Sequence, residues 1–226
     1  KAEFIRSELA LRAKCEVEVR RSIGLQVDPQ ADAQARAEYL YKVGLLKKYF
    51  QTAIRVELSQ LEPYLQKDPW SEVLENKRVL VIHPFNATIE SQYNTNRDFL
   101  FADKRVLPKF KSLETIKAVQ TIAGNNSVFK DWFEALDFMK KEIDKKDFDI
   151  AIIGCGAYGF PLAAHVKRRG KKAIHMGGPT QMFFGIKGKR WEDNEKFKTI
   201  INDYFVNPTD QDIPKDFNKV EGGCYW

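Results

Sequence analysis

Three glycines in a G-x-G-x-x-G pattern are the clearest candidates for binding chemistry in this sequence. Gly154, Gly156 and Gly159 directly follow the apolar run FDIAII and precede FPLAAHVKRR, which has helical spacing. Glycines in such a turn let the backbone approach a ligand closely, and the free N–H groups at a helix N-terminus attract phosphate. We therefore predict that these glycines and Tyr158 bind a phosphate group. The alternative is a tight turn in which the glycines serve steric needs only.

The predicted strand at 172–176 indicates which class of phosphate ligand to expect. That strand ends Ile174-His175-Met176, without the acidic residue that holds a ribose hydroxyl in dinucleotide sites. We therefore expect a nucleotide or a nucleotide-sugar in preference to NAD. A dinucleotide-dependent oxidoreductase is the less favoured alternative.

Polar residues also follow two other predicted strands, where a parallel sheet binds its ligands. His83 closes the run RVLVIH, and His175 lies near the end of KAIHM. His83 is a candidate general base toward an acceptor hydroxyl. The predicted ligand contacts here are Asn86, Thr88, His175, Gly177, Gly178 and Gln181. The alternatives are that each imidazole bonds the backbone at its strand end, and that Asn86 and Thr88 only cap the following helix.

A short basic segment comes next along the chain. Lys187, Lys189 and Arg190 lie within four positions, beside glycines and Trp191. A glycine-spaced basic loop can close over an anionic ligand and neutralise its charge. We therefore add these three cations to the predicted ligand contacts, with a solvated surface loop as the alternative.

Composition excludes several classes of protein. The net charge of +6 and the pI near 9.1 suit an anionic ligand, but basic and acidic residues are interspersed, and no zinc-finger or RNP-like motif predicts a nucleic-acid partner. Three cysteines without CxxC spacing argue against a disulfide framework or a cysteine-ligated metal. No apolar run approaches the ~18 residues of a membrane-spanning helix. We expect a soluble, cytoplasmic protein.

The pattern of elements predicts how these residues are positioned. Buried strands are expected at 78–83, 148–153 and 172–176, with a less regular strand at 115–122, and helices alternate with them. One helix should be capped by Ser127, and another should cover 192–205. Such alternation predicts an α/β fold with a parallel, Rossmann-like sheet over residues 71–226. Residues 1–70 should form a mainly helical region, with helices over 28–44 and 45–61 and a helix stop at Gly44.

Longer stretches resemble known proteins. The runs at 149–178 (DIAIIGCGAYGFPLAAHVKRRGKKAIHMGG), 180–191 (TQMFFGIKGKRW) and 220–226 (VEGGCYW), with 61–64 and 79–85, resemble uncharacterised proteins of bacterial surface-polysaccharide gene clusters. The last sheet unit is similar, more loosely, to GT-D-type glycosyltransferases, whose A-I-D-I-G-H motif would correspond to residues 173–178. Of the acidic R-x-G-D-G-E motif of that group, only Arg6 and Glu8 have counterparts here.

This resemblance implies a glycosyltransferase-like protein that uses a nucleotide-sugar donor and a glycan acceptor for surface polysaccharide synthesis. Glu8 becomes a second candidate catalytic residue. Because the aspartate and glycines of the acidic motif are absent, the sequence predicts no certain metal ligand, and a divalent cation is doubtful. The alternative is a non-catalytic nucleotide- or sugar-binding component of a glycan assembly complex. Self-association or association with a glycan-assembly partner is compatible with either.

Overall fold

The computed structural model describes residues 44, 48, 54, 56–120 and 127–226. The chain forms two compact units, Lys1–Val56 and Glu57–Trp226. Most of the first unit, including nearly all of both predicted N-terminal helices, lies outside the described residues. Gly44, which we predicted to end a helix, is itself helical, as is Lys48. The rest of this section concerns the second unit.

The second unit contains a parallel sheet of four strands. These are β1 (Arg78–His83), β2 (Ser112–Lys117), β3 (Ile150–Ile153) and β4 (Lys172–His175), in the spatial order β2-β1-β3-β4. The chain leaves β1 toward β2 and later returns to pair β3 on the other side of β1. The boundary between β1 and β3 is therefore the point where the direction of winding reverses. The predicted α/β, Rossmann-like class is confirmed.

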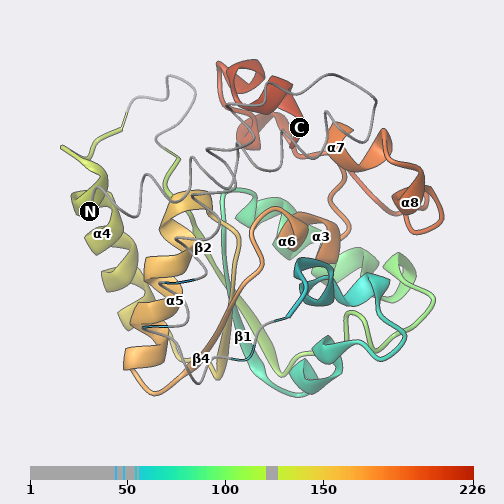
Figure 1. The fold of residues 1–226 in the computed structure, drawn as a ribbon, viewed down its shortest axis with the longest axis horizontal. Coiled ribbons are helices and arrows are strands. Elements are labelled where there is room, and N and C mark those ends of the chain that lie inside the picture. Colours follow the sequence, from blue (N-terminus) through green and yellow to red (C-terminus); the bar gives the residue numbers. More distant parts are fainter. Residues whose placement is uncertain (1–43, 45–47, 49–53, 55, 121–126) are drawn as a thin grey trace. The chain divides into compact units, whose positions relative to one another are not determined.

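Helices cover both faces of the sheet. The helix α3 (Asn86–Leu100) follows β1, α4 (Trp132–Asp144) follows β2, and α5 (Gly159–Arg168) follows β3. Figure 1 shows α4 and α5 on one face and α3 with α6 (Pro179–Phe183) on the other. Because both faces are covered, successive side chains of β1 enter two different cores, and its sequence reads as an unbroken apolar run. Full burial of each such side chain contributes roughly 1.5–3 kcal/mol.

The three long helices of the sheet region begin differently. The Asp131 carboxylate accepts hydrogen bonds of 2.9 Å from the amides of Phe133 and Glu134, so Asp131 caps α4 and not Ser127 as we predicted. The Ser127 hydroxyl, four residues before Asp131, instead accepts a hydrogen bond from the Phe129 amide. In contrast, α3 and α5 have no side-chain N-cap. Both follow the central strands β1 and β3, at the carboxyl edge of the sheet.

The predicted strand at 115–122 is shifted. Strand β2 begins at Ser112 and ends at Lys117, and Ile122 lies outside the described residues. The Ala118 amide still donates to the His83 carbonyl, so the chain leaves the sheet directly after that point. Lys117 is therefore the carboxyl end of this strand.

The predicted helix at 192–205 is wrong. Only α7 (Lys189–Glu192) and α8 (Glu195–Lys198) form there. The Asn194 side chain starts a new helix by accepting from the Lys196 amide, and the Asn202 amide group donates to the carbonyls of Phe99 and Leu100 at the end of α3. Because of these long-range bonds, the segment after α8 packs along the end of α3 and does not continue as a helix.

Short 3-10 turns complete the unit. They comprise Leu58–Leu61, Pro63–Leu65, Trp70–Leu74, Gly156–Tyr158, Asp210–Asp212, Phe217–Lys219 and Glu221–Gly223. No helix among the described residues is long and apolar enough to cross a membrane.

Candidate functional site

The predicted site residues meet at the carboxyl edge of the sheet, between β1 and β3. The Gly154 amide donates a 2.9 Å hydrogen bond to the Ile82 carbonyl, which extends the pairing of the two strands by one residue. His83 lies next to Gly154, because a Cβ added to this glycine would be 2.7 Å from the His83 ring. In open α/β sheets, ligands bind at such a reversal of strand order.

The three glycines of the turn have different surroundings. Gly154 and Gly159 are buried: a Cβ on Gly154 would lie 2.7 Å from the Gly177 carbonyl oxygen, and one on Gly159 would lie 2.1 Å from His175 Nε2. Gly156 is exposed, has φ +53, and has nothing within 4 Å of its Cβ position. The outer glycines are therefore required for packing, and the middle one leaves open space for a ligand. This division matches the glycine roles in dinucleotide-binding turns.

The middle of the turn also offers hydrogen-bond donors. Among the backbone hydrogen bonds of the described residues, none is donated by the amides of Gly156 or Ala157. Helix α5 starts directly after them with no side-chain cap, so its positive dipole end has no compensating anion from a capping residue. Nearby, the fully buried Thr180 hydroxyl has no hydrogen-bond partner among the described residues, and it would lie 2.6 Å from a Cβ on Gly154. Open amides, a helix dipole and this hydroxyl suit an anionic ligand.

His83 is buried at the end of β1. Its Nδ1 accepts a 3.0 Å hydrogen bond from the Phe85 amide, and burial lowers the pKa of the ring to about 3. The ring is neutral at pH 7, so its proton is on Nε2. His83 is therefore placed as a hydrogen-bond donor through Nε2, and its role as a base stays a prediction.

Asn86 and Thr88 lie in the first turn of α3 but make specific side-chain contacts. The Asn86 amide group donates to the Thr115 hydroxyl on β2 at 3.2 Å, and the buried Thr88 hydroxyl donates to Asp212 at 2.6 Å. Neither side chain caps α3, whose N-cap residue is Phe85. Their direct contact with a ligand stays a prediction.

Tyr158 and Gln181 are both committed to packing in this structure. The Tyr158 ring is buried and stacks on Trp132, with centroids 5.1 Å apart and planes within 8°. The Gln181 side chain is buried, and its amide group donates to the Tyr225 carbonyl at 3.1 Å. These contacts hold α4 against α5 and the C-terminal segment against α6.

The turn after β4 is a second glycine turn. Gly177 has φ +68 and open space at its Cβ position, whereas a Cβ on Gly178 would lie 3.1 Å from the Tyr225 ring. His175, half-buried at the end of β4, lies over Gly159 as described above. The turns after β3 and β4 thus lie side by side at this edge of the sheet.

The basic segment is not the open loop we expected, because Lys189 and Arg190 begin the short helix α7 and Lys187 lies just before it. The Lys187 ammonium pairs with Glu192 at 3.0 Å, and Arg190 donates to the Tyr225 hydroxyl at 2.9 Å with its guanidinium 5.5 Å from that ring. Lys189 is exposed and makes no ion pair with any described residue. Arg190 is connected through Tyr225 to Gly178, and Lys189 retains its charge for an external anion.

Two further predictions concern a catalytic carboxylate and a metal site. Glu8 lies outside the described residues. Within residues 56–120 and 127–226, no group of three or more His, Cys, Asp or Glu side chains is arranged to hold a metal ion.

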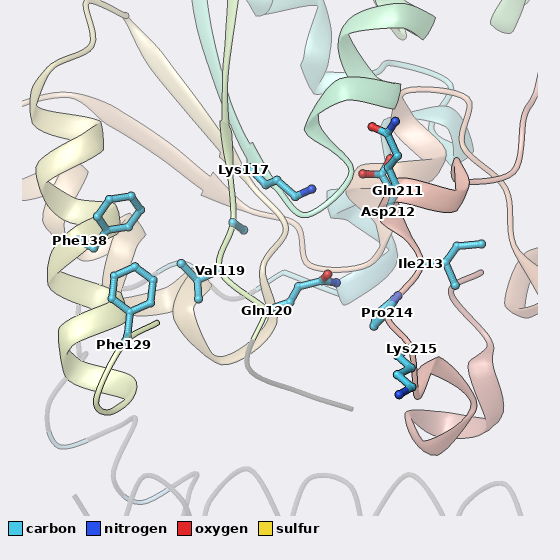
Figure 2. Close-up of a pocket in the computed structure, with 11 residues that line it drawn as sticks. Lys117, Val119, Gln120, Phe129, Phe138, Gln211, Asp212, Ile213, Pro214 and Lys215 are labelled. Carbon is cyan, nitrogen blue, oxygen red and sulfur yellow. The ribbon is translucent and has the colours of Figure 1, made fainter. Parts of the chain in front are cut away.

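A cavity of about 570 Å³ at the same edge of the sheet is lined by residues that we did not predict (Figure 2). It lies between the carboxyl end of β2 and the C-terminal segment. Its charged lining residues are Lys117, Asp212 and Lys215. The rule that ligands bind beyond parallel strands could have found Lys117, but nothing local in the sequence distinguishes Asp212 from the other acids of the C-terminal segment.

Comparison with known proteins adds no relative. No protein-family model matches the chain, and no curated protein or solved structure matches it significantly.

Proposed function

We propose that this protein binds the diphosphate of a nucleotide-sugar at the boundary between β1 and β3 and transfers its sugar to a glycan acceptor. The observation that carries this proposal is the turn at Gly156, where the amides of Gly156 and Ala157 donate no backbone hydrogen bond to a described residue and α5 begins without a side-chain cap. The α3 N-terminus, also uncapped, follows the adjacent strand. Two helix dipoles and open amides at one strand reversal favour a multiply charged ligand.

The chemistry of this transfer suits the turn. The leaving group is a nucleoside diphosphate, and its negative charge grows as the glycosidic bond to the sugar breaks. Fixed N–H donors that face this charge stabilise the transition state without having to reorganise. Lys189 and Arg190 would add positive charge from the C-terminal side. The His83 Nε2–H is a further donor beside Gly154.

Calorimetric titration with UDP-, GDP-, CDP- and TDP-sugars tests the binding step. We expect saturable heat with at least one of them, and loss of this heat in Gly156→Val, whose branched side chain would occupy the open space above the turn. Gly170→Val is the matched control, because Gly170 lies at the other end of α5, has φ +75 and likewise has nothing within 4 Å of its Cβ position. Equal effects of both substitutions, or no heat from any donor, would contradict the proposal.

Two assays separate the proposed transferase from its alternatives. A transferase releases nucleoside diphosphate when a suitable acceptor is added, whereas a non-catalytic binding component of a glycan assembly complex binds the donor and releases none. An NADH fluorescence titration addresses the oxidoreductase alternative, since the glycine roles in the turn match those of dinucleotide sites while β4 ends without an acid. Saturable NADH binding would replace the nucleotide-sugar proposal.

A further inference from the structure

The cavity beside β2 contains a buried carboxylate that the proposed nucleotide site does not use. Asp212 is only 4% exposed, and its Oδ2 accepts from the Thr88 hydroxyl at 2.6 Å and the Thr209 hydroxyl at 3.1 Å. The Trp226 indole N–H donates to its backbone carbonyl at 3.1 Å. No described residue donates to Oδ1. The carboxylate is thus held from one side in a fixed orientation, and its second oxygen is left for another donor.

Two lysines at the same cavity lack an anionic partner in the part of the chain that the structure describes. Neither Lys117 nor Lys215 forms an ion pair with a described residue, although Glu114, on the same strand as Lys117, pairs with Lys146 at 2.7 Å. Figure 2 shows the Lys117 side chain extending from β2 toward Asp212, with Lys215 further along the C-terminal segment. Two ammonium groups that line one cavity and form no ion pair with a described residue favour an anion over a neutral ligand.

The other lining residues suit a small organic molecule. Phe129 and Phe138 pack together with ring centroids 5.0 Å apart on the α4 side, and Gln120 extends toward Pro214 on the opposite wall (Figure 2). The volume of about 570 Å³ is within the range of small-molecule sites, roughly 300–1,000 Å³. An apolar wall, an amide and fixed charges provide both surface and orientation.

We propose that this cavity binds a hydroxylated small molecule with an anionic group, of the class of sugar phosphates. Lys117 or Lys215 binds the anionic group, and Asp212 Oδ1 accepts a hydrogen bond from a ligand hydroxyl. The lysines alone would bind any small anion, whereas a carboxylate repels an anion and attracts a hydroxyl. The combination therefore selects molecules in which the two groups are separated. This site is additional to the glycine turn and does not require that the turn bind a nucleotide.

Calorimetry with glucose 6-phosphate and with inorganic phosphate tests the lysines. We expect saturable binding of glucose 6-phosphate to the full chain and a loss of about tenfold or more in Lys117→Ala/Lys215→Ala, since hydrogen bonds to charged groups contribute about this factor each. Lys77→Ala/Lys111→Ala is the matched control. It removes the same charge at the opposite edge of the sheet, where the Lys111 amide donates to the Lys77 carbonyl. The control should bind like the wild type.

Asp212→Asn tests the carboxylate, because it should affect the affinities for glucose 6-phosphate and for inorganic phosphate differently. Asparagine keeps an oxygen for the threonine hydroxyls but removes the negative charge. We expect glucose 6-phosphate to bind several-fold more weakly to this variant, and inorganic phosphate to bind equally or more tightly. A mere loss of folding would weaken both, and thermal melting of each variant identifies that case. Thr209→Val, which keeps the charge and leaves Thr88 to hold the carboxylate, is a milder second variant that should weaken glucose 6-phosphate binding and leave inorganic phosphate binding unchanged.

Three results would overturn the proposed ligand site in the cavity. The proposal is overturned if glucose 6-phosphate does not bind, if the control pair of lysines has the same effect as Lys117 and Lys215, or if Asp212→Asn weakens both ligands alike while remaining folded. Gly156→Val should leave glucose 6-phosphate binding unchanged. Failure of the nucleotide proposal, seen as no heat from any nucleotide-sugar, is therefore distinguishable from failure of this one.

Discussion

The Thr88 hydroxyl donates a 2.6 Å hydrogen bond to the buried carboxylate of Asp212, 124 residues further along the chain. This bond joins the first turn of α3 to the C-terminal segment at the carboxyl edge of the sheet. Because Asp212 lines the cavity and Thr88 follows the strand that carries His83, the bond also connects the cavity to the region of the strand reversal. The C-terminal segment is thus attached to the first turn of α3 at this edge of the sheet.

Thr88→Val should destabilise the protein. The substitution preserves shape but leaves the buried carboxylate with only the Thr209 hydroxyl, and loss of a hydrogen bond to a charged group costs about 1.5–3 kcal/mol. Urea unfolding measures the change. Thr95→Val is the control, because Thr95 is an exposed residue of the same helix that bonds only the Ser91 carbonyl, and we expect a much smaller effect there. Equal effects would show that Asp212 does not depend on Thr88.

Gly159 and His175 should be energetically coupled. Gly159 has helical φ and ψ values, so alanine there would ordinarily favour the helix by about 1 kcal/mol. The His175 ring, however, occupies the space that a Cβ needs. Gly159→Ala should destabilise the wild type by roughly 1–3 kcal/mol and should be neutral or stabilising in a His175→Ala background. A double-mutant cycle by urea unfolding measures this coupling, and additive effects would contradict the packing described here.

Lys189 should contribute more to nucleotide binding than Lys187 does. Lys187 is already paired with Glu192, whereas Lys189 is exposed without an ion pair to any residue in the described part of the chain. Changing Lys189 and Arg190 together to Ala should weaken nucleotide-sugar binding and reduce its dependence on salt. Titrations at two ionic strengths measure both quantities. Lys187→Ala serves as the comparison, and an equal loss in this variant would show that general surface charge is responsible.

Strands were the most predictable part of this protein. The run RVLVIH predicted β1 correctly from Arg78 to His83, because a strand covered on both faces must be apolar at every position. The helix expected at 192–205 failed, because the local pattern does not report that Asn202 bonds the end of α3. Spacing found the glycine turn but could not tell that Gly154 and Gly159 pack against histidines while Gly156 is open. That distinction depends on contacts between separate strand ends.

Cys155, within the glycine turn, should be unreactive in the folded protein. Burial raises the pKa of its thiol to about 12, so almost no thiolate exists at pH 8. Cys224 is only half-buried. We expect iodoacetamide at pH 8 to modify Cys224 faster than Cys155, and denaturant to abolish the difference. Peptide mass spectrometry at timed intervals measures both rates. Rapid modification of Cys155 without denaturant would mean that the turn opens readily.

His83 should make stability depend on pH in a defined direction. Its pKa is lowered by burial to about 3 in the folded protein and is about 6.5 in the unfolded chain. Between these values the unfolded state binds more protons, so stability is complete above pH 6.5 and falls as the pH falls toward 3. At pH 5 the expected loss is about 2 kcal/mol.

The variant His83→Asn isolates this contribution. In the wild type the Phe85 amide donates to His83 Nδ1. The asparagine side chain keeps an oxygen near this amide as an acceptor, and it does not titrate. Urea unfolding of wild type and variant between pH 7 and pH 5 avoids most carboxylate titrations, including that of Asp149, whose pKa is held low by the Arg78 guanidinium. The wild type should lose stability relative to the variant over this range, whatever the variant's absolute stability. Parallel curves would mean that His83 takes up its proton without leaving its buried position, and the imidazole would then be available as a base near neutral pH.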